Sequence, residues 1–199
     1  MAYDRAKTLD VLKKHLEPNI LNHSLALEAC MGGLYNYFSE QNLLDDNEPT
    51  KEEWQEAGLL HDVDYSGEFK AEHPHKTQEA LDKYGLDPIP DTVMHIIKAH
   101  AAKMTDTDLE TKADWSIFCA DSLTGLIVAV ALILPSKKLA DVKLSSVMKR
   151  FLKQLNFAAG TRRDEVAMCE NPEGLNIPTE KFVEICLDSM KAVAGVIGL

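Results

Sequence analysis

Histidine and aspartate are the residues of this sequence whose types and positions suggest chemistry. Five of its seven histidines lie on or beside apolar stretches with the three- and four-residue spacing of a helix. These five are His23, His61, His73, His75 and His100. The doublet His61-Asp62 ends the apolar segment AGLLHDVDY, and Asp121 lies within the most apolar part of the chain. Imidazole and carboxylate groups together form a ligand set that suits Zn, Fe, Mn or Ni.

The surroundings of Asp121 favour a bound cation. An ionised carboxylate among apolar residues is costly unless it is paired or binds a metal. Its own helical stretch offers few cationic partners, because Lys112 lies about two and a half turns away and the next lysine comes after Pro135. We therefore expect a divalent cation rather than an ion pair. An arginine paired with Asp121 would remove this need.

The elements that must position these residues are helices. Apolar spacing of three and four dominates the chain, strand signals are nearly absent, and no linker divides it. We expect an all-α fold, with a single domain over residues 1–199 and about eight to nine helices. The first expected elements are a short helix that ends near Pro18, a helix over about 22–38 and a helix that begins at the capping box Thr50–Glu53. Further helices are expected over 74–84 (ended by Gly85), 91–102, 112–134 and 144–157. A short helix after Thr161 and a helix over 179–196 are expected last.

Composition narrows the function classes. A formal net charge of −11 argues against a nucleic-acid polymer or an anionic membrane as partner. The N-terminus is charged and amphipathic rather than a secretory signal, and the most apolar run, 122–134, is shorter than the roughly 20 residues of a membrane span. The four cysteines show no C-x-x-C pattern, so we expect buried, reduced thiols and a cytoplasmic location.

Three motifs together resemble a known family. His23 in NHSLALE, His61-Asp62 in LLHDVD and Asp121 in CADSLTG reproduce the H…HD…D pattern of the HD superfamily of metal-dependent phosphohydrolases. The doublet alone is weak evidence, but the four residues in this order on apolar helices form a specific pattern. The chain is most similar to the HDIG-type subgroup of small bacterial hydrolases, over most of its length.

The resemblance implies an HD-type helical bundle and a metal site. It assigns His23, His61, Asp62 and Asp121 as ligands, with Asp62 able to bridge to a second metal. Extra histidines complete a second site in HDIG-type members, and the matching positions here are His73 and His100. The implied cofactor is one or two divalent ions per chain (Mn, Fe, Zn, Ni, Co or Mg). A solvent-facing His73 and a hydrogen-bonded core His100 are the competing interpretations.

The implied reaction is metal-assisted hydrolysis. A divalent cation lowers the pKa of a bound water from 15.7 to about 7. The family's glycine is replaced here by Asp64, which adds a carboxylate where a general acid or base could act. We therefore predict Asp62, Asp64 and His75 as catalytic residues, with Asp64, His75 or an unliganded His100 as the proton donor to the leaving group.

A basic segment suggests where an anionic substrate binds. Residues 136–153 carry six lysines and arginines against one acid, Asp141, in an acidic chain. We predict that Lys138 and Lys143 contact a small phosphorylated substrate, although such a segment is more often a solvated helix face.

Three functions are compatible with these patterns. The first is a phosphohydrolase that cleaves a phosphomonoester or phosphodiester of a nucleotide or small metabolite. The second is an HD-type di-iron oxygenase, and the third is a non-catalytic nucleotide-binding sensor. The apolar end of the last helix, VAGVIGL, is also compatible with a homodimer contact. The sequence does not choose the substrate, the metal or the oligomeric state.

Overall fold

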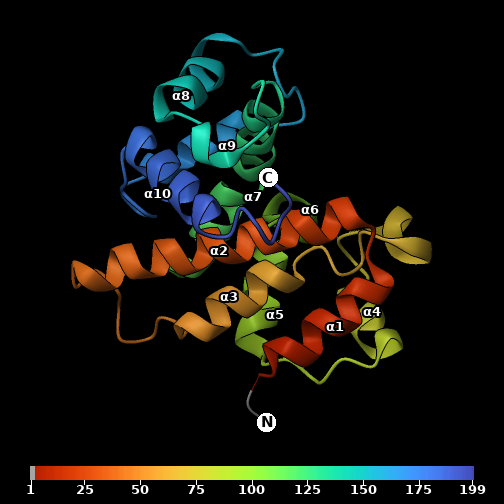
Figure 1. Cartoon of the computed structure of the whole chain (residues 1–199). Coiled ribbons are helices and arrows are strands. Elements are labelled where there is room, and N and C mark those ends of the chain that lie inside the picture. Colours follow the sequence, from red (N-terminus) through yellow and green to blue (C-terminus); the bar gives the residue numbers. More distant parts are fainter. Residues whose placement is uncertain (1–2) are drawn as a thin grey trace.

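The computed structural model describes residues 3–199 and shows an all-α fold (Figure 1). No residue in that range lies in a β-strand, and eight of its ten α-helices have eight or more residues, so the predicted fold class is confirmed. Short 3₁₀ helices cover Gly67–Glu72, Leu139–Asp141 and Met168–Glu170. The α-helices are α1 (Arg5–His15), α2 (Pro18–Glu40), α3 (Lys51–Leu60), α4 (Thr77–Tyr84), α5 (Asp91–Ala99), α6 (Ala102–Thr105), α7 (Lys112–Leu132), α8 (Leu144–Lys153), α9 (Arg163–Ala167) and α10 (Thr179–Ala192).

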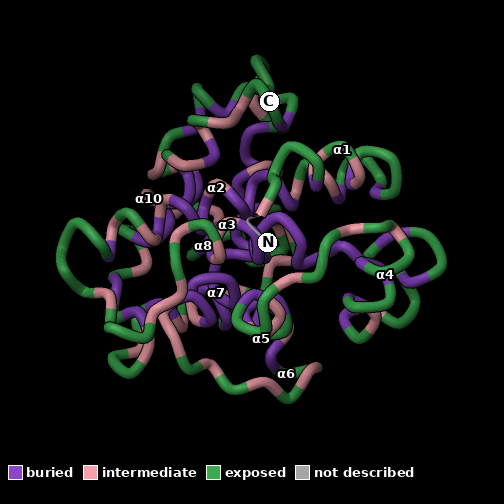
Figure 2. Tube along the Cα trace, turned by 90° about the horizontal axis from the view of Figure 1, so that it is seen from below, coloured by how far each residue is buried: buried purple, intermediate pink, exposed green. Residues whose placement is uncertain are grey.

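Helices α2 and α7 form the centre of the molecule. Figure 1 shows α2 crossing the whole structure, with α1, α3, α4 and α5 on one side and α8, α9 and α10 on the other. Helix α2 packs against α3, α7 and α10, and α7 also packs against α5 and α9. Figure 2 shows buried backbone concentrated along α2, α3 and α7, while the outer loops are exposed. A residue on α2 or α7 can therefore face the interior and still reach side chains from several other helices.

Helix α7 is the core helix that the sequence predicts. It begins with a capping box between Thr111 and Asp114, and its side chains are buried on nearly all sides. Among the described helices it alone is long and apolar enough to cross a membrane, with a mean hydropathy of 1.8, yet 67% of that apolar window is buried inside the protein. It ends at Leu132, before Pro135, because proline cannot continue a helix.

Several helix boundaries agree with the sequence and others differ. Helix α8 ends at Lys153 rather than near 157, and α10 ends at Ala192 rather than near 196. The capping box of Thr50 and Glu53 starts α3, and Gly85 ends α4 in the left-handed conformation with φ of 69°, as predicted. Pro18 begins α2 rather than closing the preceding helix, because the first helical position needs no backbone N–H donor. Helix α4 begins at Thr77, after a 3₁₀ helix over Gly67–Glu72. All four cysteines are free and buried, as predicted.

Helices α2 and α3 approach each other closely at Gly58. A Cβ atom at Gly58 would lie 2.9 Å from the Cα of Glu28, closer than real Cβ contacts. Glycine therefore lets the two helices meet at this point. His61 follows one turn later as the C-cap of α3, so the same contact positions it beside α2.

Candidate metal centre

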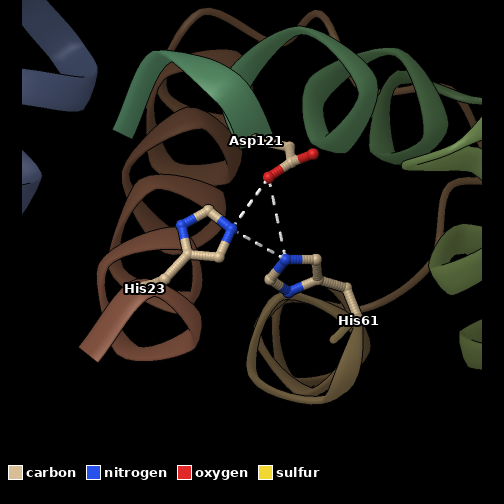
Figure 3. Close-up of side chains that lie close together, drawn as sticks. All are labelled: His23, His61 and Asp121. Atoms are coloured by element: carbon tan, nitrogen blue, oxygen red, sulfur yellow. Dashed lines mark hydrogen bonds and ion pairs between the residues drawn. The ribbon is translucent and has the colours of Figure 1, made fainter. Parts of the chain in front are cut away.

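Three distant stretches of chain converge, as the sequence predicts, and bring together a first group of residues that could hold a metal ion. Figure 3 shows His23 from α2, His61 from the end of α3 and Asp121 from the middle of α7 pointing toward one another. The Nε2 atom of His23 lies 3.1 Å from His61 Nε2 and 2.9 Å from Asp121 Oδ1. His61 Nε2 lies 3.7 Å from the same carboxylate oxygen. The three ligating atoms thus surround one point.

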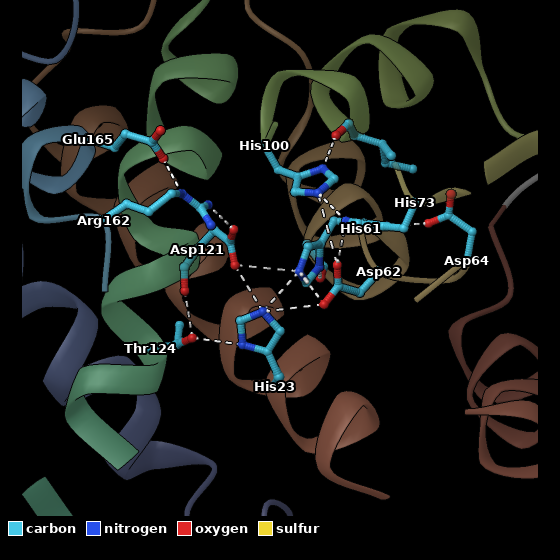
Figure 4. A network of polar contacts seen from close by, with 12 residues as sticks. His23, His61, Asp62, Asp64, His73, His100, Asp121, Thr124, Arg162 and Glu165 are labelled. Atoms are coloured by element: carbon cyan, nitrogen blue, oxygen red, sulfur yellow. Dashed lines mark hydrogen bonds and ion pairs between the residues drawn. The ribbon is translucent and has the colours of Figure 1, made fainter. Parts of the chain in front are cut away.

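A second group forms beside the first, around Asp62, His73 and His100. His73 Nε2 lies 3.5 Å from Asp62 Oδ1 and 3.3 Å from His100 Nε2. The other oxygen of Asp62, Oδ2, faces the first group, at 3.6 Å from His23 Nε2 and 3.4 Å from His61 Nε2. Figure 4 shows Asp62 between the two groups. Both histidines predicted for a second metal site therefore lie with Asp62 in one group that could hold a metal ion.

The hydrogen bonds of the four imidazoles orient their Nε2 atoms inward. His61 Nδ1 lies 3.0 Å from the carbonyl oxygen of Gly58, and His100 Nδ1 bonds the carbonyl oxygen of Ile97. Carbonyl oxygens only accept hydrogen bonds, so each Nδ1 carries a proton, and in the neutral form of either ring the Nε2 lone pair faces the centre. A histidine that donates from one ring nitrogen and ligates with the other is typical of metal sites.

The other two imidazoles follow the same rule. His73 Nδ1 lies 2.7 Å from Asp64 Oδ1. His23 Nδ1 lies 2.9 Å from the hydroxyl oxygen of Thr124, and that hydroxyl donates its own proton to the carbonyl oxygen of Asp121. Thr124 Oγ1 is therefore an acceptor for His23. All four rings thus direct their Nε2 atoms at one another and at two carboxylates.

This arrangement needs positive charge at its centre. Two imidazole lone pairs 3.1 Å apart repel each other unless a proton or a cation lies between them. Ligand atoms bound at about 2.0–2.2 Å in a tetrahedron are separated by roughly 3.3–3.6 Å, which resembles the spacing in both groups. The two His/Asp groups could therefore each hold a metal ion. The same set of imidazole and carboxylate ligands suits several divalent metals.

Without a cation, the two carboxylates hold a proton on His61. Burial opposes a charged ring at His61, yet Asp62 and Asp121 raise its pKa to about 9. Burial, together with the charge on His61, lowers the pKa of His100 to about 4. Although burial also opposes ionisation of Asp121, His23 and His61 hold the pKa of that carboxyl well below its usual range. His100 is therefore neutral at pH 7, which suits ligation rather than proton donation.

The expectation that Asp121 lacks a cationic partner is wrong. Arg162, just before α9, places Nη2 2.6 Å from Asp121 Oδ2 and its Nε against Glu165. The partner comes from 41 residues further along the chain, because α9 packs on α7. The salt bridge uses only one oxygen of Asp121. Since Oδ1 still faces His23 and His61, the carboxylate serves both the arginine and the histidine pair.

Asp64 does not lie at the cavity, where the sequence analysis expects it to act as a general acid or base. It is fully buried and does not line the cavity that contains the two groups. Its carboxylate accepts from His73 Nδ1 at 2.7 Å and from the backbone N–H of Lys76 at 2.9 Å. Asp64 therefore orients His73, a candidate ligand, and is not placed to protonate a leaving group.

The structure also places three other predicted residues outside the site. His75 is exposed and lines a separate polar cavity with His95 and Lys98. Lys138 and Lys143 are exposed and do not line the cavity of the two ligand groups. Periodicity gave no direct information on these loop residues, because the path of a loop depends on the helices that it joins.

The cavity beside the ligands has a volume of about 940 Å³. His23, Asp62, His73, His100 and Asp121 line it, while His61 lies behind them, fully buried. Two cations that the sequence analysis did not assign, Arg162 and Lys103, also line it. Arg162 follows the basic segment in the sequence, but nothing local distinguishes it from its neighbours. Only the packing of α9 on α7 brings it to the cavity.

Comparison with known proteins identified no relative of this chain. No family model, curated protein or solved structure matches this chain. The similarity to the HD superfamily therefore depends on the four motif residues and their order, and membership stays a prediction.

Proposed function

We propose that this protein is a metal-dependent phosphohydrolase of the HD type. The observation that carries the proposal is the pair of His/Asp groups that share Asp62 at the wall of a large cavity, with Arg162 beside them. A divalent cation held there supplies Lewis acidity and a readily ionised water, which is the chemistry that ester hydrolysis requires.

The residues of the chain hold the reacting groups in place. His23, His61 and Asp121 form one ligand group, and Asp62 connects it to His73 and His100. Arg162 directs Nη2 to Asp121 and Nε to Glu165, while its Nη1 bonds no residue within 3–199. A guanidinium with a free donor beside a cation site is suited to bind and orient a phosphoryl oxygen. Arg162 replaces Lys138 and Lys143 as our candidate for substrate recognition.

Metal analysis followed by an activity screen tests this proposal. Purified protein is analysed for bound metals, that metal is restored, and phosphomonoesters and phosphodiesters are screened for turnover. We expect Asp62→Ala to lose both metal retention and activity, because this carboxylate faces both ligand groups. The matched control is the double variant Lys138→Ala/Lys143→Ala, whose KM should equal that of the wild type. Full turnover by Asp62→Ala would show that the site is misassigned.

A di-iron oxygenase is the second candidate, because four imidazoles and two carboxylates in two adjoining groups could also hold two iron ions. Spectroscopy on the purified protein separates the two candidates. A mixed-valent di-iron signal would favour oxygenation, whereas a colourless Mn, Zn or Mg protein would favour hydrolysis. Tight nucleotide binding without turnover on any substrate would favour the sensor instead.

A further inference from the structure

The cavity changes from charged to apolar along helix α7. Asp121, Gly125, Val128 and Leu132 all line it, at spacings of four, three and four residues, so they lie on one face of the helix. Asp121 belongs to the ligand group, and Leu132, eleven residues later, is 49% exposed at the opening. Eleven residues of helix span about 16 Å. A molecule bound at the ligand groups would therefore extend along an apolar wall.

Apolar side chains from other parts of the chain complete the cavity. Ile20 from α2, Met104 from α6, and Ile197 and Leu199 from the segment after α10 also line it. Met104 is 61% exposed, so the opening as well as the wall is apolar. Apart from the ligand groups and the cations near Asp121, the polar side chains of the lining are few. They are Asn19, Asn22, Tyr65, Thr124 and Glu165; Thr124 already bonds His23, and Glu165 is paired with Arg162 and Lys103.

Gly125 widens the apolar part of the cavity. A Cβ atom built on this residue meets no heavy atom of another element within 4 Å, so the residue faces open space. Glycine within a helix is less stable than alanine, and nothing packs closely enough on Gly125 to require it for helix contacts. The missing side chain instead leaves room between the ligand groups and the wall at Val128.

We propose that the ligand of this cavity is an amphiphilic phosphate monoester, with an anionic head at the His/Asp groups and Arg162 and an apolar chain along α7. As a statement about the substrate, this rests on the proposed hydrolase function. A nucleotide would bury several polar atoms of its base and sugar against the apolar wall, which is costly without hydrogen-bond partners. An apolar chain gains up to about 0.8 kcal/mol for each buried methylene.

Calorimetric binding to the metal-loaded protein tests the proposal independently of turnover. The probes are inorganic phosphate, adenosine monophosphate, and the non-hydrolysable methyl-, butyl- and octylphosphonates. We expect affinity to rise by about two- to fourfold for each added methylene, since 0.8 kcal/mol per methylene is the upper limit. Octylphosphonate should bind more tightly than adenosine monophosphate. Affinity that is independent of chain length, or tighter binding of the nucleotide, would overturn the proposal.

A variant that fills part of the cavity tests where the alkyl chain of the ligand lies. Gly125→Leu should weaken octylphosphonate binding at least tenfold and leave methylphosphonate and inorganic phosphate unchanged, because only the long chain reaches that position. Gly125→Ala is the matched control and should reduce octylphosphonate binding only slightly; thermal melts verify that both variants fold. Equal octylphosphonate affinity in the wild type and Gly125→Leu would overturn the proposed path.

The same measurements separate this proposal from the function on which it rests. Binding that depends on chain length, combined with no hydrolysis of octyl phosphate, would contradict the hydrolase and leave the amphiphilic ligand supported. Hydrolysis of small phosphate esters, combined with no dependence on chain length, would support the hydrolase and refute the apolar chain.

Discussion

Four imidazoles in this protein each donate from Nδ1 to an acceptor and present Nε2 to a neighbour. The acceptors differ: two are backbone carbonyl oxygens, one is the hydroxyl of Thr124 and one is the carboxylate of Asp64. Such outer hydrogen bonds fix the ring orientation and raise the basicity of the ligand. Asp64, which the sequence suggests as a catalytic acid, therefore acts through His73.

Replacing Asp64 tests this role at the level of one residue. Asp64 accepts two hydrogen bonds, from His73 and from the backbone of Lys76, and the amide of Asp64→Asn can accept only one of them well. We expect metal affinity at the group of Asp62, His73 and His100 to fall by about 10- to 100-fold, with the other group unchanged. Metal titration followed by elemental analysis measures both sites.

The control for this substitution is Asp141→Asn, which removes an exposed carboxylate far from the ligands in sequence. It should bind metal like the wild type. Unchanged affinity at both sites in Asp64→Asn would show that His73 needs no carboxylate to hold its orientation.

At the scale of helices, replacing either of two glycines with alanine should change the free energy of unfolding in opposite directions. Gly58 lies where α3 meets the backbone of Glu28, whereas Gly125 faces the cavity. Gly58→Ala should lower the free energy of unfolding by about 1–3 kcal/mol, because the added methyl forces the helices apart. Gly125→Ala should raise it by about 0.5–1 kcal/mol, the difference in helix propensity. Urea denaturation measures both, and a gain in stability for Gly58→Ala would contradict the packing described here.

Helix α3 also carries a buried acid, Glu56, which is only 6% exposed. Burial, assisted by the charge of Glu53, raises the pKa of Glu56 to about 7. The folded protein therefore holds a proton that the unfolded chain releases between about pH 4.5 and 7. Because the unfolded state binds fewer protons in that window, the free energy of unfolding falls as the pH rises through it.

Glu56→Gln should remove this pH dependence. The variant is expected to be more stable than the wild type by about 3 kcal/mol at pH 8, because the rise of the pKa from 4.5 to about 7 is worth about 1.4 kcal/mol per pH unit, and nearly equal at pH 4. Urea denaturation at the two pH values measures the difference. Glu52→Gln, at an exposed position in the first turn of α3, is the control. A stability difference of equal size at both pH values would refute the assignment.

At the scale of the whole molecule, the ligand groups connect α2, α3, α5 and α7. An ion that binds the folded state alone stabilises it, by about 2.7 kcal/mol at a free concentration of 100 times its Kd. For a chain of this size that corresponds to a rise in Tm of roughly 5–10 °C. Thermal melts of metal-loaded and chelator-treated protein measure this effect. It should vanish in Asp62→Ala and persist in Asp141→Asn, and equal melting temperatures in the wild type would contradict metal binding.

The sequence by itself determined the fold class and most helix positions, and together with the family resemblance it pointed to the six histidines and aspartates of the two groups that could hold a metal ion. Helical spacing shows which face of each helix is buried, and a polar residue on such a face needs a partner, which singled out Asp121 and the histidines. Caps such as Thr50 and Gly85 set helix ends through local hydrogen bonds and backbone conformation, so they too can be recognised from the sequence.

Tertiary structure alone decided which partners these residues have. Arg162 reaches Asp121 because α9 packs on α7, and Asp64 turns to His73 because the chain folds back after Asp62. The same packing places Lys138 and Lys143 outside the cavity. Contacts between side chains far apart in sequence depend on the angles and distances between packed helices, and these are set by the whole core. Local sequence patterns show which residues are buried, but they do not show from which part of the chain a partner side chain comes.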